Sequence, residues 1–517
     1  MKTRLFFTPV AVAVLALTAG AAAHAGETIE FENGAKLEWR VNANYTLAQR
    51  MESPDAVLAA NAAGNDGNNN FNKGSLTANR LALLFESKLS KGDSGFVLSA
   101  STFYDDVYHR TNDNNPSATN PNKVSKPAPY NEFTDETKRY HGGYSRILDA
   151  YGYTSFDLGS TGRATVRLGR HVVNWGEALY FPNIAAAQGP FDGTKAGVPG
   201  TEVKDSVLPE DQISAIFEIT PRLSVAAQVQ YGFHETLAPA AGSFMSTSDV
   251  TGYGATCAGV YFGAKCFGMT RQADIVPGNT GQWGIGTRFR VTDETEVGLY
   301  YLNYNDRMPL PILKPTGATT GSYNIRYHDD VKMLAGTAST TFGSFTTYGE
   351  VSLRNDTPIL VGALATPKRA DATQINIGTM YNVGRTRFAD AITVLGELSS
   401  VKYRDYGVPE SGLTFKTDSG LAFAGTVALS WPGIVEGWDL SVPISYSRQL
   451  DGRTLIGTSL NGEKDERYSI GATFTRQGNL SLGVTYLGYN GDASLATPVN
   501  RLSTDRDQLS FNAKYSF

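Results

Sequence analysis

Apolar and polar residues alternate with a period of two along most of this chain. In the first such stretch, 35–49, the residues between the apolar positions are mostly polar or charged. Its apolar face carries Leu37, Trp39, Val41, Ala43, Tyr45 and Leu47. The pattern returns many times, for example at 222–234 and 508–517. Alternation of this kind predicts β-strands that have one apolar and one polar face.

The connections between these stretches alternate between short and long. We find about eighteen stretches, joined by short links such as 90–94 and by long ones such as 106–145 and 171–210. A transmembrane barrel has tight turns on its periplasmic rim and longer loops on its extracellular rim. We therefore predict an all-β fold, a transmembrane antiparallel up-and-down β-barrel of about eighteen strands, with sixteen as the alternative count.

The last stretch, 508–517, keeps its alternation up to Phe517. An open sheet edge is not tolerated in hydrocarbon, so a sheet in a membrane has to close on itself. We expect 508–517 to pair with 35–49, and both to begin or end on the short-turn rim. The aromatic last residue also resembles the C-terminal signal of outer-membrane barrels.

The first residues have the pattern of a secretory signal peptide. Lys2 and Arg4 precede an apolar run at 10–23, which small residues follow. A membrane anchor is the alternative, but the run is short for a bilayer. We expect a signal peptide at 1–25, a single barrel domain at 26–517, and a location in the bacterial outer membrane.

Composition narrows the classes of partner and site. The net charge of −5 and the lack of a basic tract argue against nucleic acid. Cys257 and Cys266 are expected to form a disulfide in an oxidising compartment, with two free thiols as the alternative. The stretch 62–75 is rich in Asn, Asp and Gly, but its carboxylates are sparse for calcium, so we expect a plain turn-rich loop and no metal site.

If the apolar faces meet lipid, the opposite faces line the lumen. The side chains that we expect in the lumen wall are Arg40, Arg167, Arg288, Arg290, Glu350 and Arg354. The full set of polar-face residues carries both signs of charge in similar number. Side chains of both signs can form ion pairs that hold the wall of the barrel. A lumen of this kind does not look strongly selective for anions or for cations.

The long connection 171–210 differs from the others. It mixes apolar and small residues with aromatic ones and has few Asn or Asp residues. A barrel of this size cannot fill its interior with wall side chains alone. We expect 171–210 to fold inward and to line or gate a path for a partly apolar solute. The alternative is a loop packed on the mouth of the barrel with no part in transport.

Two blocks of sequence resemble a known family. "LGRHVVNWGEALYFPN" and "GTKAGVPGTEVKDSVLPEDQISA" resemble the signature of outer-membrane proteins grouped as domain of unknown function 1302, and "DGNNNFNKGSLTANRL" with "STFYDD" resembles its N-terminal block. The stretch 180–193 departs from the pattern. The resemblance implies an exported β-barrel whose relatives often accompany a second exported protein and an inner-membrane transporter for hydrophobic compounds.

The candidate path residues lie in or beside these signature blocks. They are Arg170, Asn174, Trp175, Glu177, Tyr180, Phe181, Glu202 and Lys204. Expected partners are membrane lipid and lipopolysaccharide, together with a periplasmic or outer-membrane partner and the inner-membrane transporter that the resemblance implies.

The leading functional hypothesis is an outer-membrane channel or transporter for a hydrophobic or amphipathic small molecule. The alternatives are a general diffusion porin for polar solutes, and a non-transporting platform that serves an export system. We expect no enzyme activity and no cofactor. The few histidines form no convincing catalytic triad, and the chain has no phosphate-binding glycine loop or zinc pair.

Overall fold

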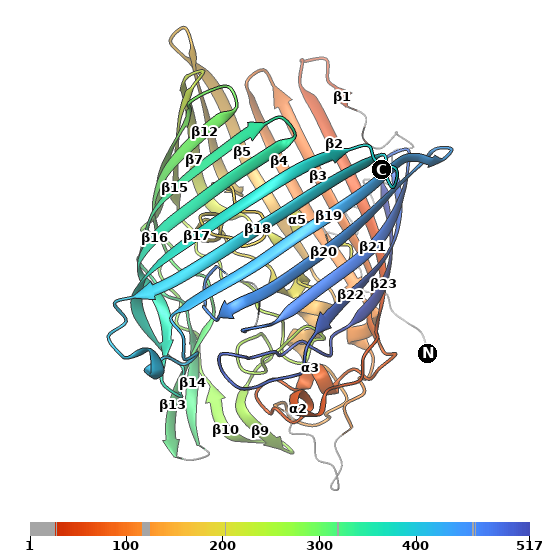
Figure 1. Cartoon of the computed structure of the whole chain (residues 1–517), viewed down its shortest axis with the longest axis vertical. Helices are drawn as coiled ribbons and strands as arrows, with labels where there is room; N and C mark the ends of the chain where they lie inside the picture. Colours follow the sequence, from red (N-terminus) through yellow and green to blue (C-terminus); the bar gives the residue numbers. More distant parts are fainter. Residues whose placement is uncertain are drawn as a thin grey trace.

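The computed structural model describes residues 26, 28–115, 125–201, 203–317, 320–457, 460 and 462–517, so the expected signal peptide lies outside the described residues. Among the described residues, the main sheet has nineteen strands. One of them, the two-residue β1 (Ile29–Glu30), only pairs antiparallel with the start of β2. The other eighteen form a closed antiparallel barrel (Figure 1). The predicted fold and the count of eighteen are confirmed.

The barrel strands follow one another around the wall in sequence order. They are β2 (Lys36–Arg50), β3 (Leu76–Lys91), β4 (Ser94–Asp105), β5 (Ser145–Leu158), β6 (Gly162–His171), β7 (Glu210–Thr220), β8 (Leu223–Gln230), β11 (Gln282–Arg290), β12 (Thr295–Tyr304), β15 (Val331–Phe342), β16 (Phe345–Val361), β17 (Thr366–Gly384), β18 (Ala391–Arg404), β19 (Ser419–Val435), β20 (Trp438–Gly452), β21 (Glu466–Arg476), β22 (Leu480–Asn490) and β23 (Gln508–Ser516).

The barrel closes between its first and last long strands. β2 and β23 pair antiparallel from Asn42 opposite Ser516 to Arg50 opposite Gln508. The expected closing pair is therefore confirmed. The start of β2 and the end of β23 lie on the rim that carries the short turns (Figure 1).

The faces of the barrel strands have the expected polarity. Outward side chains such as Leu168, Leu299 and Ile377 are more than half exposed, at 57%, 58% and 60%. Inward side chains such as Gln374 and Asn376 are fully buried. An apolar belt around a closed barrel is the surface that lipid covers, so these strands span a membrane.

No helix among the described residues has the length and apolar character to cross a membrane. The helices are short and lie in the loops. They are α2 (Ala56–Ala59), α3 (Asp66–Asn69), α4 (Asp135–Thr137), α5 (Val203–Ser206), the 3-10 turns η1 (Asp106–His109), η3 (Ala185–Ala187), η4 (Gly193–Lys195) and η5 (Glu410–Gly412), and the π-helical turn η2 (Lys138–Gly142).

A second sheet, which the sequence did not predict, forms from two of the long loops. Its strands are β9 (Cys257–Phe262), β10 (Lys265–Arg271), β13 (Leu310–Gly317) and β14 (Thr320–Arg326). The expected disulfide between Cys257 and Cys266 is present and joins β9 to β10. The two loops meet because β10 pairs in parallel with β14, fifty residues further along the chain.

The Asn-rich stretch 62–75 is turn-rich as expected, and residues 65–71 within it are buried. Asn65, Asp66 and Asn68 are at most 2% exposed. Two buried arginines hold this stretch: Arg50 donates to the carbonyls of Asn68 and Phe71, and Arg506 donates to that of Gly67. The sequence does not reveal this burial, because Arg506 approaches from the far end of the chain.

These contacts belong to a cap of loops on the long-loop rim, formed by residues 51–75, 106–115, 125–144, 232–256 and 491–507. The cap has its own apolar cluster of Phe71, Tyr108, Phe133 and Phe244. Phe71 contacts the other three rings at centroid distances of 5.4 to 6.2 Å. The cap is therefore a packed structure in which three separate loops share one core.

Candidate functional site in the barrel lumen

The connection 171–210 runs through the interior of the barrel between β6 and β7. Figure 1 shows its helix α5 enclosed by the strands of the wall. Its polar contacts reach wall strands on several sides of the lumen.

Two wall carboxylates anchor the first part of the loop. Glu350, on β16, accepts hydrogen bonds from the backbone N–H groups of Glu177, Ala178 and Ile184, at 2.6, 3.3 and 2.7 Å. A charged acceptor makes hydrogen bonds that are stronger than those between neutral groups. The turn between residues 177 and 184 is therefore built around the side chain of Glu350.

Glu397, on β18, holds the next three backbone groups of the same turn. It accepts from the N–H groups of Leu179, Tyr180 and Phe181, at 2.7, 3.1 and 3.2 Å. Tyr348 donates its hydroxyl to Glu397 at 2.5 Å and so fixes the carboxylate from the wall side. The six hydrogen bonds to the two carboxylates thus replace those that the loop backbone would otherwise make to water.

The side chain of Asn183 adds a polar contact at the end of this turn. It accepts from the hydroxyl of Ser352 at 2.6 Å and from the guanidinium of Arg354 at 2.9 Å. Arg354 also donates to Gln374 at 2.8 Å. Arg354 lies in the lumen wall, where the sequence places it, and its contacts are to the loop and to β17.

The later part of the loop contacts the opposite side of the barrel, at the seam between β2 and β23. The carbonyl of Gly200 accepts from Asn44 on β2 at 2.7 Å, and that of Gly197 accepts from Gln508 on β23 at 2.7 Å. A side chain on Gly200 would come within 2.3 Å of Asn512, so the close approach requires glycine there. The loop therefore spans the lumen from β16 and β18 to the β2–β23 seam.

Lys204 fixes the end of the crossing. Its ammonium group lies 2.8 Å from Glu86 on β3 and 2.9 Å from Asp149 on β5. Arg40, on β2, pairs with Glu86 from the other side at 2.5 Å. These half-exposed ion pairs position the loop more than they stabilise the fold, because exposed pairs contribute little free energy.

Trp175 packs on an apolar part of the inner wall. Its indole is 6% exposed and stacks with Tyr300 at a centroid distance of 5.7 Å. The same cluster contains Ile184 from the loop, Leu302 from β12 and Met333 from β15. Inward-facing apolar residues on β12 and β15 are explained by this contact, since the loop covers them.

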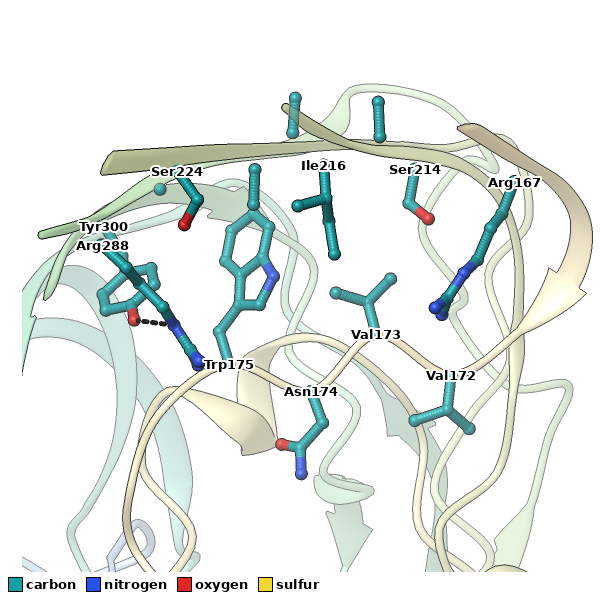
Figure 2. A pocket seen from close by; sticks show the side chains of 14 residues that line it. Arg167, Val172, Val173, Asn174, Trp175, Ser214, Ile216, Ser224, Arg288 and Tyr300 are labelled. Atoms are coloured by element: carbon teal, nitrogen blue, oxygen red, sulfur yellow. Dashed lines mark hydrogen bonds between the residues drawn. The ribbon is translucent and has the colours of Figure 1, made fainter. Parts of the chain in front are cut away.

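A cavity of about 230 Å³ lies between the start of the loop and the wall. Figure 2 shows Val173, Trp175 and Ile216 along its middle, with Arg167 at one end and Arg288 at the other. Ile216 faces the lumen and remains 41% exposed. The cavity therefore has an apolar centre and a cationic group at each end.

The other predicted path residues occupy different places. Asn174 also lines the cavity, and the Tyr180 hydroxyl donates to Thr426 on β19 at 2.7 Å. Phe181 is buried against Ala422, Ala424 and Leu460. Glu202 lies outside the described residues.

Arg170 does not join the others in the lumen. It pairs with Asp211, its register partner on β7, through two hydrogen bonds of 2.9 Å. It lies two residues after the outward-facing Leu168, so it belongs to the outer face near the long-loop rim. Of the other expected wall residues, Arg290 is exposed near the short-turn end of β11.

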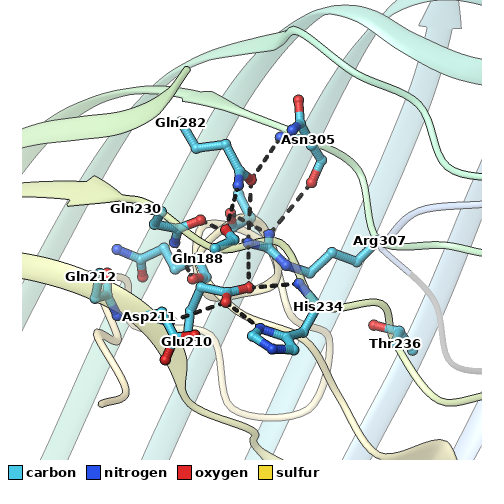
Figure 3. A network of polar contacts seen from close by, with 12 residues as sticks. Gln188, Glu210, Asp211, Gln212, Gln230, His234, Thr236, Gln282, Asn305 and Arg307 are labelled. Carbon is cyan, nitrogen blue, oxygen red and sulfur yellow. Dashed lines mark hydrogen bonds and ion pairs between the residues drawn. The ribbon is translucent and has the colours of Figure 1, made fainter. Parts of the chain in front are cut away.

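A buried polar network ties the loop to the long-loop rim (Figure 3). Arg307, 4% exposed, donates to Gln230 at 2.7 Å and lies 3.4 Å from Glu210. It also donates to the carbonyl of Ala187 in the loop at 3.3 Å. The network joins 171–210 to the connection 305–330, and it includes the backbone carbonyl of Gln188, which accepts from Gln230 at 2.6 Å.

Glu210, Asp211 and His234 bring ligand-type atoms within 4.8 Å of one another. Each carboxylate already has a cation, since Arg307 contacts Glu210 and Arg170 contacts Asp211. The imidazole of His234 donates to the carboxylate of Glu210 at 2.5 Å. The cluster is explained as part of the rim network without a metal ion.

Sequence reasoning missed Glu397, Glu210 and Arg307 as parts of the site. Glu397 sits on the polar face of its strand, as many wall residues do, and nothing in its neighbourhood in sequence marks it. Arg307 follows a strand in a stretch that reads as an ordinary loop. Only the three-dimensional path of 171–210 distinguishes these residues.

The cap should open more readily as pH rises. Burial raises the pKa of Asp249 to about 6, and burial together with Asp249 raises that of Asp66. A carboxyl with a folded-state pKa above its unfolded value gives stability that is complete below about pH 4 and is lost as pH rises through about 6. We expect protease cleavage within 62–75 to be faster at pH 8 than at pH 5.

The control for this prediction is Asp249→Asn, which keeps an acceptor for the N–H of Asp66, now 2.9 Å from the carboxylate. This variant should show a smaller difference in cleavage rate between the two pH values. Equal cleavage rates for the wild-type protein at pH 5 and pH 8 would contradict the assignment.

Comparison with known proteins gives one family and several solved structures. The chain matches the family described as "Protein of unknown function (DUF1302)" over residues 6–517. No curated protein matches it. Its fold is similar to that of Acinetobacter baumannii OccAB4, at 11% identity over 96% of this chain and 100% of that one, with a TM-score of 0.46.

Two further structures are similar at the same level. Pseudomonas aeruginosa OccK5 (OpdH) is 8% identical over 93% of this chain and 98% of that one, with a TM-score of 0.43. The outer membrane channel DcaP of Acinetobacter baumannii is 12% identical over 96% and 100%, with a TM-score of 0.40. Similarities of this size say nothing about a solute, but the family match extends over almost the whole chain, and the chain therefore belongs to the DUF1302 family of unknown function.

Proposed function

We propose that this protein is an outer-membrane channel or transporter for a hydrophobic or amphipathic small molecule, and that residues 171–210 form its constriction. The observation that carries the proposal is the path of this loop. It crosses the lumen and faces the wall with Val173 and Trp175, and it leaves an apolar cavity there beside the exposed Ile216.

The charges of the lumen wall support this function over that of a channel that selects ions by their charge. Several lumen arginines pair with carboxylates, as Arg40 does with Glu86 and Arg288 does with Glu296. A lumen with paired charges of both signs gives no strong electrostatic preference. Selection then depends on the width and polarity of the constriction.

A second candidate is a platform without transport. The observation that favours it is the packed cap on the long-loop rim, together with the loop that crosses the lumen. Lipid and lipopolysaccharide around the apolar belt, and the exported and inner-membrane partners that the family resemblance implies, remain predictions under either function.

The test uses Trp175→Ala in vesicles that contain the purified protein. Removal of the indole leaves a space next to the existing cavity, so the constriction widens on its apolar side. We expect the flux of a small hydrophobic dye to rise several-fold and that of a polar dye of similar size to change little. The measurement is the rate of dye entry, with barrel assembly checked by protease resistance.

The matched control is Trp283→Ala, because Trp283 lies next to the site in the wall but faces outward and is 43% exposed. It should leave both fluxes unchanged. Equal hydrophobic flux in wild type and Trp175→Ala would refute the role of the loop. If the wild type assembles but passes neither dye, the platform function is supported. If it passes the polar dye faster than the hydrophobic dye, a general diffusion porin is supported.

A further inference from the structure

Of the two arginines that line the cavity, Arg167 has no polar partner among the described residues. It lies on the inner face of β6 and lines the cavity beside Val173. Within the described ranges, no hydrogen bond or ion pair reaches its guanidinium. Its nearest recorded contact is the ring of Tyr151, whose centroid lies 5.8 Å from Cζ.

The arginine at the other end of the cavity is already satisfied. Arg288 donates to the hydroxyl of Tyr300 at 3.0 Å and lies 3.8 Å from Glu296. Glu177 in the loop also interacts with it electrostatically. An anion in the cavity would therefore be repelled at the Arg288 end by two carboxylates and attracted at the Arg167 end.

The surface between the two ends suits an apolar body. Val173 and Trp175 from the loop face Ile216 from β7 across the cavity (Figure 2). An apolar cavity of about 150 Å³ is enough for benzene. The cavity here, of about 230 Å³, therefore has room for one ring with a substituent or for a medium-length alkyl chain.

We propose that this cavity binds an amphipathic monoanion, with a carboxylate at the guanidinium of Arg167 and an apolar body of about eight carbons against Val173, Trp175 and Ile216. A guanidinium binds a carboxylate through two parallel hydrogen bonds, which fixes its orientation as well as its charge. This inference rests on the proposed function and names the class of solute that the site recognises.

The experiment measures binding to the purified, detergent-solubilised full-length protein by calorimetry. Four probes test the contributions of the charged head group and of the apolar body separately: octanoate, octylamine, octanol and acetate. We expect octanoate to bind most tightly. Octanol lacks the charge, acetate lacks the body, and octylamine carries the opposite charge, so each should bind at least about tenfold more weakly.

Arg167→Gln should lower the affinity for octanoate at least about tenfold, because one charged hydrogen-bonding partner is lost. The affinity for octanol should change little. The control is Arg163→Gln, which removes the same charge four residues earlier on the same face of β6, where Arg163 pairs with Asp93 at 2.5 Å. Ile216→Asn should lower the affinity for both octanoate and octanol. Protease resistance confirms that each variant is folded.

Failure to bind octanoate, equal octanoate affinity in wild type and Arg167→Gln, or equal binding of octylamine would each overturn the proposal. These outcomes are separate from those of the flux test. A barrel that passes the hydrophobic dye but does not prefer octanoate retains the proposed function and loses the anion site. A barrel that binds octanoate at Arg167 but passes no dye loses the transport function and keeps the site.

Discussion

Replacement of both Glu350 and Glu397 by alanine is expected to raise the ion conductance of the barrel in planar bilayers several-fold. Together these carboxylates accept six backbone N–H groups from the turn between Glu177 and Ile184. A hydrogen bond to a charged group contributes about 1.5–3 kcal/mol. Without them, several buried N–H groups lose their partners, and the turn should leave the wall for water.

The wall itself should survive this double substitution, because β16, β17 and β18 pair along their whole length through backbone hydrogen bonds. The matched control is Glu296→Ala, which removes a lumen carboxylate that pairs with Arg288 and does not contact the loop backbone. The control should conduct as the wild type does. Wild-type conductance in the double variant would show that 171–210 is not the constriction.

The sequence predicts the barrel well because its main determinant is local. The side chains of a strand alternate between its two faces, so the lipid-facing set can be recognised without knowing any partner strand. The same reasoning extends to closure, since a membrane sheet has to pair its ends, as β2 and β23 do. Neither conclusion requires knowledge of which loops meet.

The loops were predicted less well, because their structure depends on partners far away in the sequence. The burial within 62–75 was not predicted because Arg506 reaches this stretch from a position 439 residues away from Gly67. The sheet of β9, β10, β13 and β14 was missed for the same reason, since two separate loops have to meet before it can form.

At the site, composition indicated which loop is unusual but not what holds it. The aromatic and small residues of 171–210 mark it out, whereas Glu397 looks like any other polar wall residue. Arg170 shows a different limit. Its parity with Leu168 could have placed it on the outer face, but it was assigned to the path because it lies in the block that resembles the family signature.

Deletion of residues 508–517 is expected to abolish formation of the folded barrel. The deletion removes nine register pairs with β2 and eight with β22. Both neighbours then present unpaired backbone groups inside the bilayer, where each costs several kcal/mol. This loss far exceeds the total stability of about 5–15 kcal/mol that is typical of folded proteins.

The measurement is the yield of protease-resistant, heat-modifiable barrel after refolding of the purified chain into lipid vesicles. Refolding without cellular assembly factors separates closure from any recognition of the aromatic last residue. The control, Phe517→Ala, removes a side chain that is 46% exposed while the backbone N–H that bonds to Val41 is kept. It should refold nearly as well as the wild type. A truncated chain that refolds with the same yield would mean that β22 and β2 tolerate open edges in lipid, and the membrane-spanning barrel would then need a different closing pair.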